Sequence, residues 1–314
     1  MLESITVIIC TYNNCQLLEN TLKTLEKQET SSGIKWSVLV VSNNCNDQTS
    51  YITQKYIQNN PILFRVVEEP TQGLAYARRR GVQETTSELI AFVDDDCLLS
   101  CDWVEQAVNF FQQHPEAGAV GSRVQLLWEV EPPSELLQFQ GYLSSYDLGD
   151  SPQQVNTYLV GAGLVVKRSA LLDSGWLDKI TLVGRNGKTL TAGDDSEIVL
   201  RIRNAGYQLW YNPCMQIEHY IPKKRISIDY LCRLLYGIGK TRPVLYVLHH
   251  NLKITTLVKL NFFVNSIYYI VRIWISMIYR NLFKENSSTL AQQRIYLSDA
   301  LGNLEGVLEL VFNK

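Results

Sequence analysis

The stretch ELIAFVDDDC (residues 88–97) decides the fold class, because an apolar run ends abruptly in three consecutive acids. Its apolar part, 89–93, suits a strand that is buried on both faces of a sheet. Three similar runs precede it: SITVIIC (4–10), SVLVVS (37–42) and ILFRVV (62–67). Helical patterns separate the runs, and strands that alternate with helices predict an α/β fold with a mostly parallel sheet flanked by helices.

Polar clusters stand where three of these strands end: TYN (11–13), NNCND (43–47) and DDD (94–96). In open α/β sheets, ligands bind in the crevice beyond the carboxyl ends of the strands. We therefore expect the three clusters to converge on one crevice. The helices between the strands are indicated by Gly73 to Glu84 and by a leucine face at helical spacing, formed by Leu17, Leu18, Leu22 and Leu25.

The later part of the chain is less regular. Its pattern predicts helices at 103–113 and 196–206 and strands at 119–124 and 158–166. Two stretches, 129–156 and 184–195, read as long irregular loops, which are usually functional or mobile inside a compact domain. The composition changes beyond Pro222, which predicts an α/β domain at 1–221 and a helical C-terminal region at 222–314.

The acids at 94–96 favour a metal site. On an extended chain Asp94 and Asp96 point to the same side, ~7 Å apart, and at an effective dielectric constant of ~20 they repel by about 2 kcal/mol. A hard cation such as Mg²⁺ or Mn²⁺ relieves this repulsion. The structural alternative is a set of acids near a helix N-terminus, since Asp102 and Trp103 begin a helix nearby.

Two further sets of residues also have both a structural and a functional interpretation. Asp194 and Asp195 precede a helix, so they suit its N-terminal cap, but a carboxylate there also suits a general base. His219 suits a hydrogen-bonded structural role or a metal ligand. The residues alone leave these alternatives open.

Composition excludes several classes of protein. A hydrophobic content of 46% is too high for a disordered chain. The seven cysteines form no CxxC pair, and the N-terminus lacks the basic start of a secretory signal, so we expect reduced thiols in a cytoplasmic protein. The net charge of −2 conceals an uneven distribution, because 221–284 holds 11 basic residues and one acid. Such a basic segment suggests an anionic partner.

The stretch 254–284 is the most apolar of the chain. Asn265, Tyr269, Arg272, Ser276, Arg280 and Lys284 draw a narrow polar stripe along it. A helix that lies in an anionic membrane surface fits this pattern better than a spanning helix, because Arg272 would cost about 2.5–3.5 kcal/mol inside the bilayer. The alternative is a helix in the core or in a homodimer interface through 222–284. The expected location is the inner face of the cell membrane, and no nucleic-acid partner is expected.

Taken together, the motifs resemble those of the family 2 glycosyltransferases, which have the GT-A fold. Seven segments match the family's patterns in order across about 1–225, including the strand-to-turn start, the D-x-D metal motif, the [ED]-D acids and the H-x-x-P-x-x-R ending. These segments are VIICTYNN (7–14), VVSNNCND (40–47), EEPTQGLAYARRRG (68–81), LIAFVDDDC (89–97), GAGLVVKRSAL (161–171), GDDSEIVLRIRNAGYQLWYNP (193–213) and HYIPKKRIS (219–227).

The resemblance implies a Rossmann-like nucleotide-sugar-binding half at 1–100 and an acceptor half at 101–221. It implies an inverting transfer from a nucleotide diphosphate sugar, most often a UDP-sugar, to a saccharide or lipid-linked acceptor, as in bacterial polysaccharide synthesis. Asp94, Asp96 and His219 would hold Mn²⁺ or Mg²⁺, and Asp195 would be the base with Asp194 beside it. The expected donor-binding residues are Thr11, Tyr12, Asn13, Ser42, Asn44, Asp47, Gly73, Arg78, Asp94 and Asp95.

Two positions depart from the family pattern. Ser42 stands where the family usually has an Asp that helps to recognise the base, and Asn43, Asn44 or Asp47 would have to compensate. Arg79 replaces the usual Asn. Arg78 suits either a solvated helix face or a positive charge that binds a diphosphate. The alternatives are a sugar-phosphate nucleotidyltransferase and an inactive sugar- or nucleotide-binding scaffold.

Overall fold

The computed structural model describes residues 4–31, 33–282 and 287–312. The chain divides into two compact units, each assembled from separate stretches of sequence. The first unit comprises Met1–Leu127, Leu143–Val183 and Asp194–Tyr220, and the second comprises Trp128–Tyr142, Gly184–Gly193 and Ile221–Lys314. The two units are described in turn.

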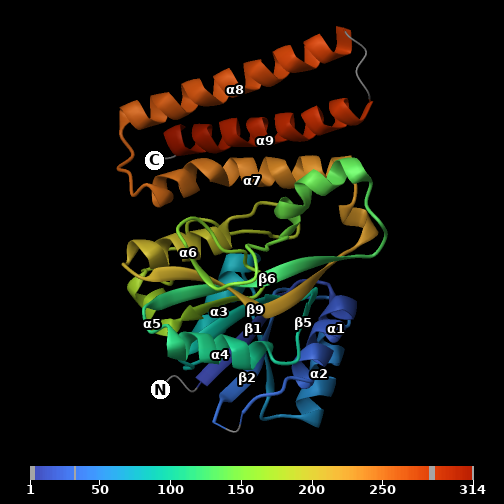
Figure 1. Cartoon of the computed structure of the whole chain (residues 1–314), viewed down its shortest axis with the longest axis vertical. Helices are drawn as coiled ribbons and strands as arrows, with labels where there is room; N and C mark the ends of the chain where they lie inside the picture. Colours follow the sequence, from blue (N-terminus) through green and yellow to red (C-terminus); the bar gives the residue numbers. More distant parts are fainter. Residues whose placement is uncertain (1–3, 32, 283–286, 313–314) are drawn as a thin grey trace. The chain divides into compact units, whose positions relative to one another are not determined.

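The first unit is built on a sheet whose early strands are all parallel (Figure 1). These strands are β1 (Ser4–Thr11), β2 (Lys35–Ser42), β3 (Phe64–Glu68) and β4 (Leu89–Asp94), in the order β3-β2-β1-β4. The register sets Thr11 opposite Ser42 and Cys10 opposite Asp94. The polar clusters that follow β1, β2 and β4 therefore meet at one edge of the sheet, as the sequence predicts.

The later strands extend the same sheet with antiparallel pairs. They are β8 (Leu164–Lys167), β6 (Ala117–Trp128), β9 (Gln208–Ile221) and β5 (Cys97–Leu99), with β7 (Gln153–Val155) paired to β9. Among the described residues the sheet has nine strands. The predicted α/β fold is confirmed, and the parallel pairs lie in its first half. The strand predicted at 158–166 begins only at Leu164, because Gly163 takes a left-handed conformation (φ +76°) just before it.

Helices pack on this sheet, and the first of them does so through the leucine face that the sequence predicts. They are α1 (Cys15–Glu26), α2 (Thr49–Asn59), α3 (Leu74–Gln83), α4 (Trp103–Gln113), α5 (Arg168–Asp173) and α6 (Asp194–Asn204). Leu18, Leu22 and Leu25 of α1 are fully buried. Helix α3 contacts β1 so closely that a Cβ at Gly81 would lie 2.5 Å from Ile8 Cγ2. This close contact holds α3 against the sheet.

The second unit contains three long helices that lie side by side, with α9 between α7 and α8 (Figure 1). Their bounds are α7 (Ile228–His249), α8 (Thr256–Leu282) and α9 (Ser287–Phe312), and two short 3₁₀ segments are η1 (Ser134–Leu143) and η2 (Lys223–Arg225). A Cβ on Gly302 would lie 2.0 Å from the Tyr236 carbonyl oxygen, so the α7 and α9 backbones are in direct contact. Segment η1 and strand β7 occupy parts of the stretch that the sequence indicated to be irregular at 129–156.

Ion pairs between α7 and α9 neutralise part of the basic surplus of 221–284. Lys240 Nζ lies 2.7 Å from carboxylate oxygens of both Glu305 and Glu309. Arg242 donates two hydrogen bonds to Asp299, of 2.7 and 2.8 Å. These cations serve the unit's own packing.

Helix α8 buries one face and exposes a broad apolar one. Ser266 and Ile273 are buried, whereas Leu257, Tyr268 and Ile275 are 78, 66 and 62% exposed. The predicted polar stripe is exposed at Asn265, Tyr269 and Arg272, while Ser276 Oγ accepts a hydrogen bond from Gln293 of α9; the side chains of Arg280 and Lys284 lie outside the described residues. Within the described chain, Thr256–Tyr279 is the one helix long and apolar enough to cross a membrane.

Candidate active site

The loop after β1 is fixed to the acidic cluster by Asp95. Thr11 Oγ1 donates to Asp95 Oδ2 at 2.6 Å, and Asn14 Nδ2 donates to Asp95 Oδ1 at 2.8 Å. Burial, together with the neighbouring charge of Asp96, raises the pKa of Asp95 to about 7. Asp95, predicted to bind the donor, thus connects two strand ends within the protein, and Thr11 is its partner.

The turn after β2 is organised by a buried residue, Asn43. Its Nδ2 donates to the carbonyls of Glu69 and Thr71, both at 2.8 Å, and its Oδ1 accepts from Gly73 N at 2.9 Å. Position 73, the N-cap of α3, requires a glycine. Its φ is +144°, and a Cβ there would lie 2.4 Å from Val183 Cγ1. Asn43 therefore shapes the crevice wall from β2 to α3.

The other predicted donor-binding residues of these turns also make contacts within the protein. Asn13 and Asn44 take left-handed conformations, with φ of +51° and +59°. Asn13 Oδ1 accepts from Asn46 N, and Asn44 Nδ2 donates to the Pro70 carbonyl. Ser42 is buried, whereas Tyr12 is 43% exposed. The predicted set thus combines an exposed ring with residues that hold the loops in place.

Asp47 fixes the starts of two helices. Its Oδ1 accepts from the backbone N–H and the hydroxyl of Thr49, at 3.0 and 2.6 Å, and its Oδ2 accepts from Cys15 N at 2.9 Å. Although partial burial opposes the effect, the hydrogen bonds from Thr49 and Cys15 keep the pKa of Asp47 below its ordinary value. The side chain satisfies N–H groups that helix starts leave unpaired.

Asp94, Asp96 and His219 form a group whose ligand atoms all lie within 4.8 Å of one another. Strand pairing produces it, because β9 sets His219 opposite Cys97 of β5, directly after the acids. His219 Nε2 lies 3.2 Å from Asp96 Oδ1, and its Nδ1 lies 2.9 Å from the carbonyl of Leu143. Since a carbonyl only accepts, Nδ1 carries the proton and Nε2 is left to face the acids.

This group fits a divalent cation. It offers two carboxylates and one imidazole nitrogen, a set that suits Mn²⁺ or Mg²⁺, and the Leu143 carbonyl orients the imidazole as outer-shell partners of metal-binding histidines commonly do. The side chains of Asp96 and His219 are each 4% exposed, whereas that of Asp94 is 34% exposed. The exposed side leaves room for phosphate oxygens and water.

Asp194 and Asp195 differ in environment although they are adjacent at the start of α6. Asp194 is 3% exposed, and its Oδ2 lies 2.5 Å from Arg78 Nη1. Burial raises the pKa of Asp194 to about 6, although the Arg78 charge opposes the rise. Asp195 is only half-buried, and its oxygens accept from the backbone N–H groups of Gly161 (2.8 Å) and Ser196 (2.7 Å). Asp195 is the more accessible of the two.

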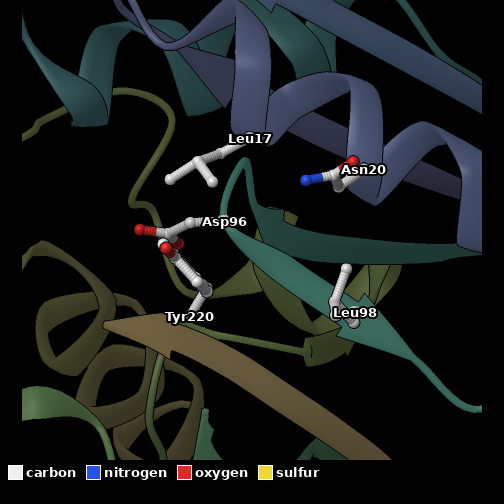
Figure 2. A pocket seen from close by; sticks show the side chains of 5 residues that line it. All are labelled: Leu17, Asn20, Asp96, Leu98 and Tyr220. Atoms are coloured by element: carbon white, nitrogen blue, oxygen red, sulfur yellow. The ribbon is translucent and has the colours of Figure 1, made fainter. Parts of the chain in front are cut away.

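A shallow pocket lies on the α1 side of Asp96. Its lining combines Leu17 and Asn20 of α1, Leu98 of β5 and Tyr220 of β9 with the Asp96 side chain. Figure 2 shows Asp96 entering the pocket between Leu17 and Tyr220. The half-buried Leu17 is therefore a pocket residue as well as a member of the predicted leucine face.

Sequence reasoning missed several residues that organise this site. Asn14 and Gly161 lie inside the quoted segments, but no role was assigned to them, because each acts through a partner more than thirty residues away. Asn43 was named only as a substitute for the acid missing at Ser42. The carbonyl of Leu143 could not be found from side-chain types at all.

The chain is similar in sequence to known glycosyltransferases. A family model described as glycosyl transferase family 2 matches residues 6–174. A relative from Haloferax volcanii, a glucosyl-dolichyl phosphate glucuronosyltransferase, is 24% identical over 250 residues, which are 78% of this chain and 78% of the relative.

Solved structures share the fold. The mannosyltransferase PcManGT from Pyrobaculum calidifontis, in complex with GDP-Man and Mn²⁺, aligns with a TM-score of 0.62 at 17% identity, covering 99% of this chain and 87% of that one. Residues 1–349 of TarS from S. aureus, in complex with UDP, align with a TM-score of 0.53 at 15% identity, covering 98% of this chain and 92% of that one.

Proposed function

The chain belongs to glycosyl transferase family 2 and is a glycosyltransferase, and from this premise we propose the chemistry of its site. A sugar is transferred from a nucleotide diphosphate sugar, a UDP-sugar by preference, to a hydroxyl of a saccharide or lipid-linked acceptor. The transfer inverts the anomeric centre, because one displacement occurs without a covalent intermediate.

One observation carries this proposal: Arg78 pairs with one acid from each of two sets of polar residues that have different environments. Asp94, Asp96 and His219 form the first set, and Asp194 with Asp195 forms the second. A diphosphate leaving group requires positive charge beside it, and an attacking hydroxyl requires a base. The two sets can meet these two needs within one crevice.

The residues act as follows. Asp94, Asp96 and His219 hold a divalent cation, which when bound neutralises the charge that grows on the leaving diphosphate. Asp195 accepts the proton of the acceptor hydroxyl at a carboxylate oxygen as that hydroxyl attacks. The N–H groups of Gly161 and Ser196 orient this carboxylate. Tyr12 contacts the nucleoside, and the exposure of its ring beside the β1 turn supports this role.

The end of β2 lacks an acid that could recognise the nucleotide base. Ser42 gives the crevice no acid at the position where the family usually recognises the base, and Asn43 and Asn44 are engaged with the protein's own backbone. TarS was solved with UDP and PcManGT with GDP-Man, so a donor panel must include both bases.

The second unit supports a membrane-surface role in the same proposal. The outer face of α8 exposes Leu257, Val264, Tyr268, Val271 and Ile275, each 48–78% exposed. A helix with an apolar face and basic residues on its polar side lies in the interfacial layer of a bilayer and is attracted to anionic lipids. The sequence of α8 contains Lys259 and Arg272 and no acid. We assign this face to an anionic lipid surface on which a lipid-linked acceptor is presented.

The activity is tested by incubating UDP- and GDP-sugars with Mn²⁺ and measuring release of the nucleoside diphosphate. Asp195→Asn is expected to lower kcat by about 10²–10⁴-fold, the usual contribution of a general base, and to leave donor affinity unchanged. Asp178→Asn, which changes an exposed acid of the same unit, is the matched control. Absence of turnover by the wild type, or full turnover by Asp195→Asn, would contradict the proposal.

A further inference from the structure

Arg78 is a buried cation that lies between the two sets of acids. It projects from α3, and its side chain is 4% exposed. Its Nη1 lies 2.5 Å from Asp194 Oδ2, and its Nη2 lies 3.6 Å from Asp94 Oδ1. One rigid guanidinium therefore connects the metal-side carboxylate with the first residue of α6.

The surroundings of the guanidinium restrict it to this position. The Phe92 ring, two residues before Asp94 on β4, lies against it with 5.5 Å between the ring centroid and Arg78 Cζ. On another side is Gly161, where an added Cβ would lie 2.8 Å from Arg78 Nη2 and 2.9 Å from Asp195 Oδ2. Arg78 and Asp195 thus approach the same glycine from two directions.

The balance of charge explains why this arginine remains ionised while buried. An unpaired buried charge is expensive, and removal of one partner of such a pair leaves the other uncompensated. Burial acts against the charged form of Arg78, but Asp194 and Asp94 outweigh it and raise the pKa of Arg78. Arg78 is already paired with Asp194 and Asp94 inside the protein, and its side chain exposes little surface to a ligand.

We propose that Arg78 is a positioning residue, which fixes Asp194, and with it the adjacent base Asp195, relative to Asp94, instead of serving as a ligand of the donor diphosphate. The proposal rests on the function proposed above. Because Asp195 follows Asp194 directly at the start of α6, any shift of Asp194 moves the base. A planar guanidinium with two donor edges maintains this spacing, and the single ammonium of a lysine cannot contact both acids in the same way.

The expected consequence is a change in rate with little change in donor affinity. A small displacement of a catalytic group costs about 10²-fold in rate. Arg78→Gln is therefore expected to lower kcat about 100-fold, with the donor Kd, measured by calorimetry with Mn²⁺, changed by less than about threefold. Arg78→Lys is expected to recover only part of the loss. Arg80→Gln changes the exposed neighbour that pairs with Glu84 on the same helix, and it is the matched control.

A double-mutant cycle separates positioning from general stability. If Arg78 and Asp194 act as one unit, the double variant Arg78→Gln/Asp194→Asn should lose no more kcat than the more damaged single variant. Effects of mutations at contacting residues are often non-additive in this way. Methylguanidinium added to Arg78→Ala should restore part of kcat at unchanged donor Kd. If Arg78→Gln does not fold, Arg78→Lys and its combination with Asp194→Asn provide the same cycle.

Three results would overturn the inference: normal kcat in Arg78→Gln, additive losses in the cycle, or a rise in donor Kd as large as the loss in kcat/KM. The last of these results would mean that Arg78 binds the nucleotide-sugar donor directly. A wild-type protein that turns over no nucleotide sugar would contradict the proposed function instead. Calorimetry of the wild type with donor and Mn²⁺ shows which of the two statements has failed.

Discussion

His219 is held from its Nδ1 side by the Leu143 carbonyl, so its Nε2 faces Asp96. Asp95, between two proposed ligands, is turned away from them by Thr11 and Asn14. In the same way, Arg78 forms an ion pair with Asp194, whereas the neighbouring Asp195 remains accessible. At the scale of single residues, local hydrogen bonds and ion pairs give neighbouring acids different surroundings.

The first residue-scale prediction concerns the metal group. His219→Gln removes the imidazole ligand, and we expect Mn²⁺ affinity to fall at least as far as it does on loss of an outer-shell partner, about 10–100-fold. Titration of Mn²⁺ followed by electron paramagnetic resonance measures this. His114→Gln, a change in a histidine stacked on Phe110 of α4, should have no effect. Equal Mn²⁺ affinity in wild type and His219→Gln would remove His219 from the ligand set.

The second residue-scale prediction concerns Asp47 and pH. Its pKa is lowered in the folded protein from an ordinary value of 3.8, so its ionised form stabilises the fold above pH ~4, and this contribution is lost as the pH falls through the lowered value. Asp47→Ala should cost about 1 kcal/mol at pH 7, as is typical when a helix-start acceptor is lost. The difference from wild type should shrink at pH 3. Urea unfolding at both pH values checks it, and a constant difference would contradict the assignment.

Residue types that act locally could be predicted from the sequence, whereas long-range partners could not. The acids at 94–96 and 194–195 stand at strand and helix ends, where their positions are visible in the hydrophobic pattern. Arg78 meets Asp194 from 116 positions away, and it was expected to contact either solvent or a diphosphate. The packing of α3 and the position of the start of α6 together bring these two residues into contact. The roles of the donor-binding residues stay predictions.

At the scale of elements, hydrophobic periodicity was a reliable guide to individual strands and helices. Buried runs such as 4–10 and 89–93 became β1 and β4, because a continuous apolar run satisfies both faces of a parallel strand. The order β8-β6-β9-β5 could not be read in this way, since antiparallel pairing depends on contacts between distant strands. The charge pattern also misled in part, because Lys240 and Arg242 pair with acids of α9.

The element-scale prediction concerns the outer face of α8. Val264→Glu places a charge on this exposed apolar face, and we expect it to abolish sedimentation with vesicles of phosphatidylglycerol and phosphatidylcholine. Asn261→Glu adds the same charge to an exposed polar position of the same helix and should retain most of the binding. The alternative outcome is a wild-type protein that does not bind the vesicles but forms a dimer, which Val264→Glu dissociates. That outcome would assign this face to a second copy of the chain.

At the scale of the whole molecule, the chain passes back and forth between its two units. Trp128–Tyr142 and Gly184–Gly193 leave the first unit and belong to the second, together with Ile221–Lys314. Phe139 in the first of these segments is 1% exposed and lies 5.6 Å from the ring of Tyr296 in α9. In the second segment, the Leu190 carbonyl contacts α7 where Gly237 has no side chain.

The whole-molecule prediction is that a protein truncated after Tyr220 will not be well folded. Its loss of α7 to α9 would expose Phe139 and leave the two inserted segments without their packing partners. We expect it to bind the dye ANS and to aggregate, as proteins with newly exposed apolar surface do. The full chain measured in parallel is the control. A monomeric truncated protein that binds no dye would show that 1–220 folds independently.

The interleaved chain also has a consequence for biosynthesis. A ribosome makes the protein from its N-terminus, so both inserted segments emerge long before the helices that pack on them. The segment Gly184–Gly193 leads directly into Asp194 and Asp195, and it cannot be fully packed until α7, which contains its partner Gly237, has been synthesised. We therefore expect the start of α6, which carries both acids, to reach its final position only after α7 has left the ribosome.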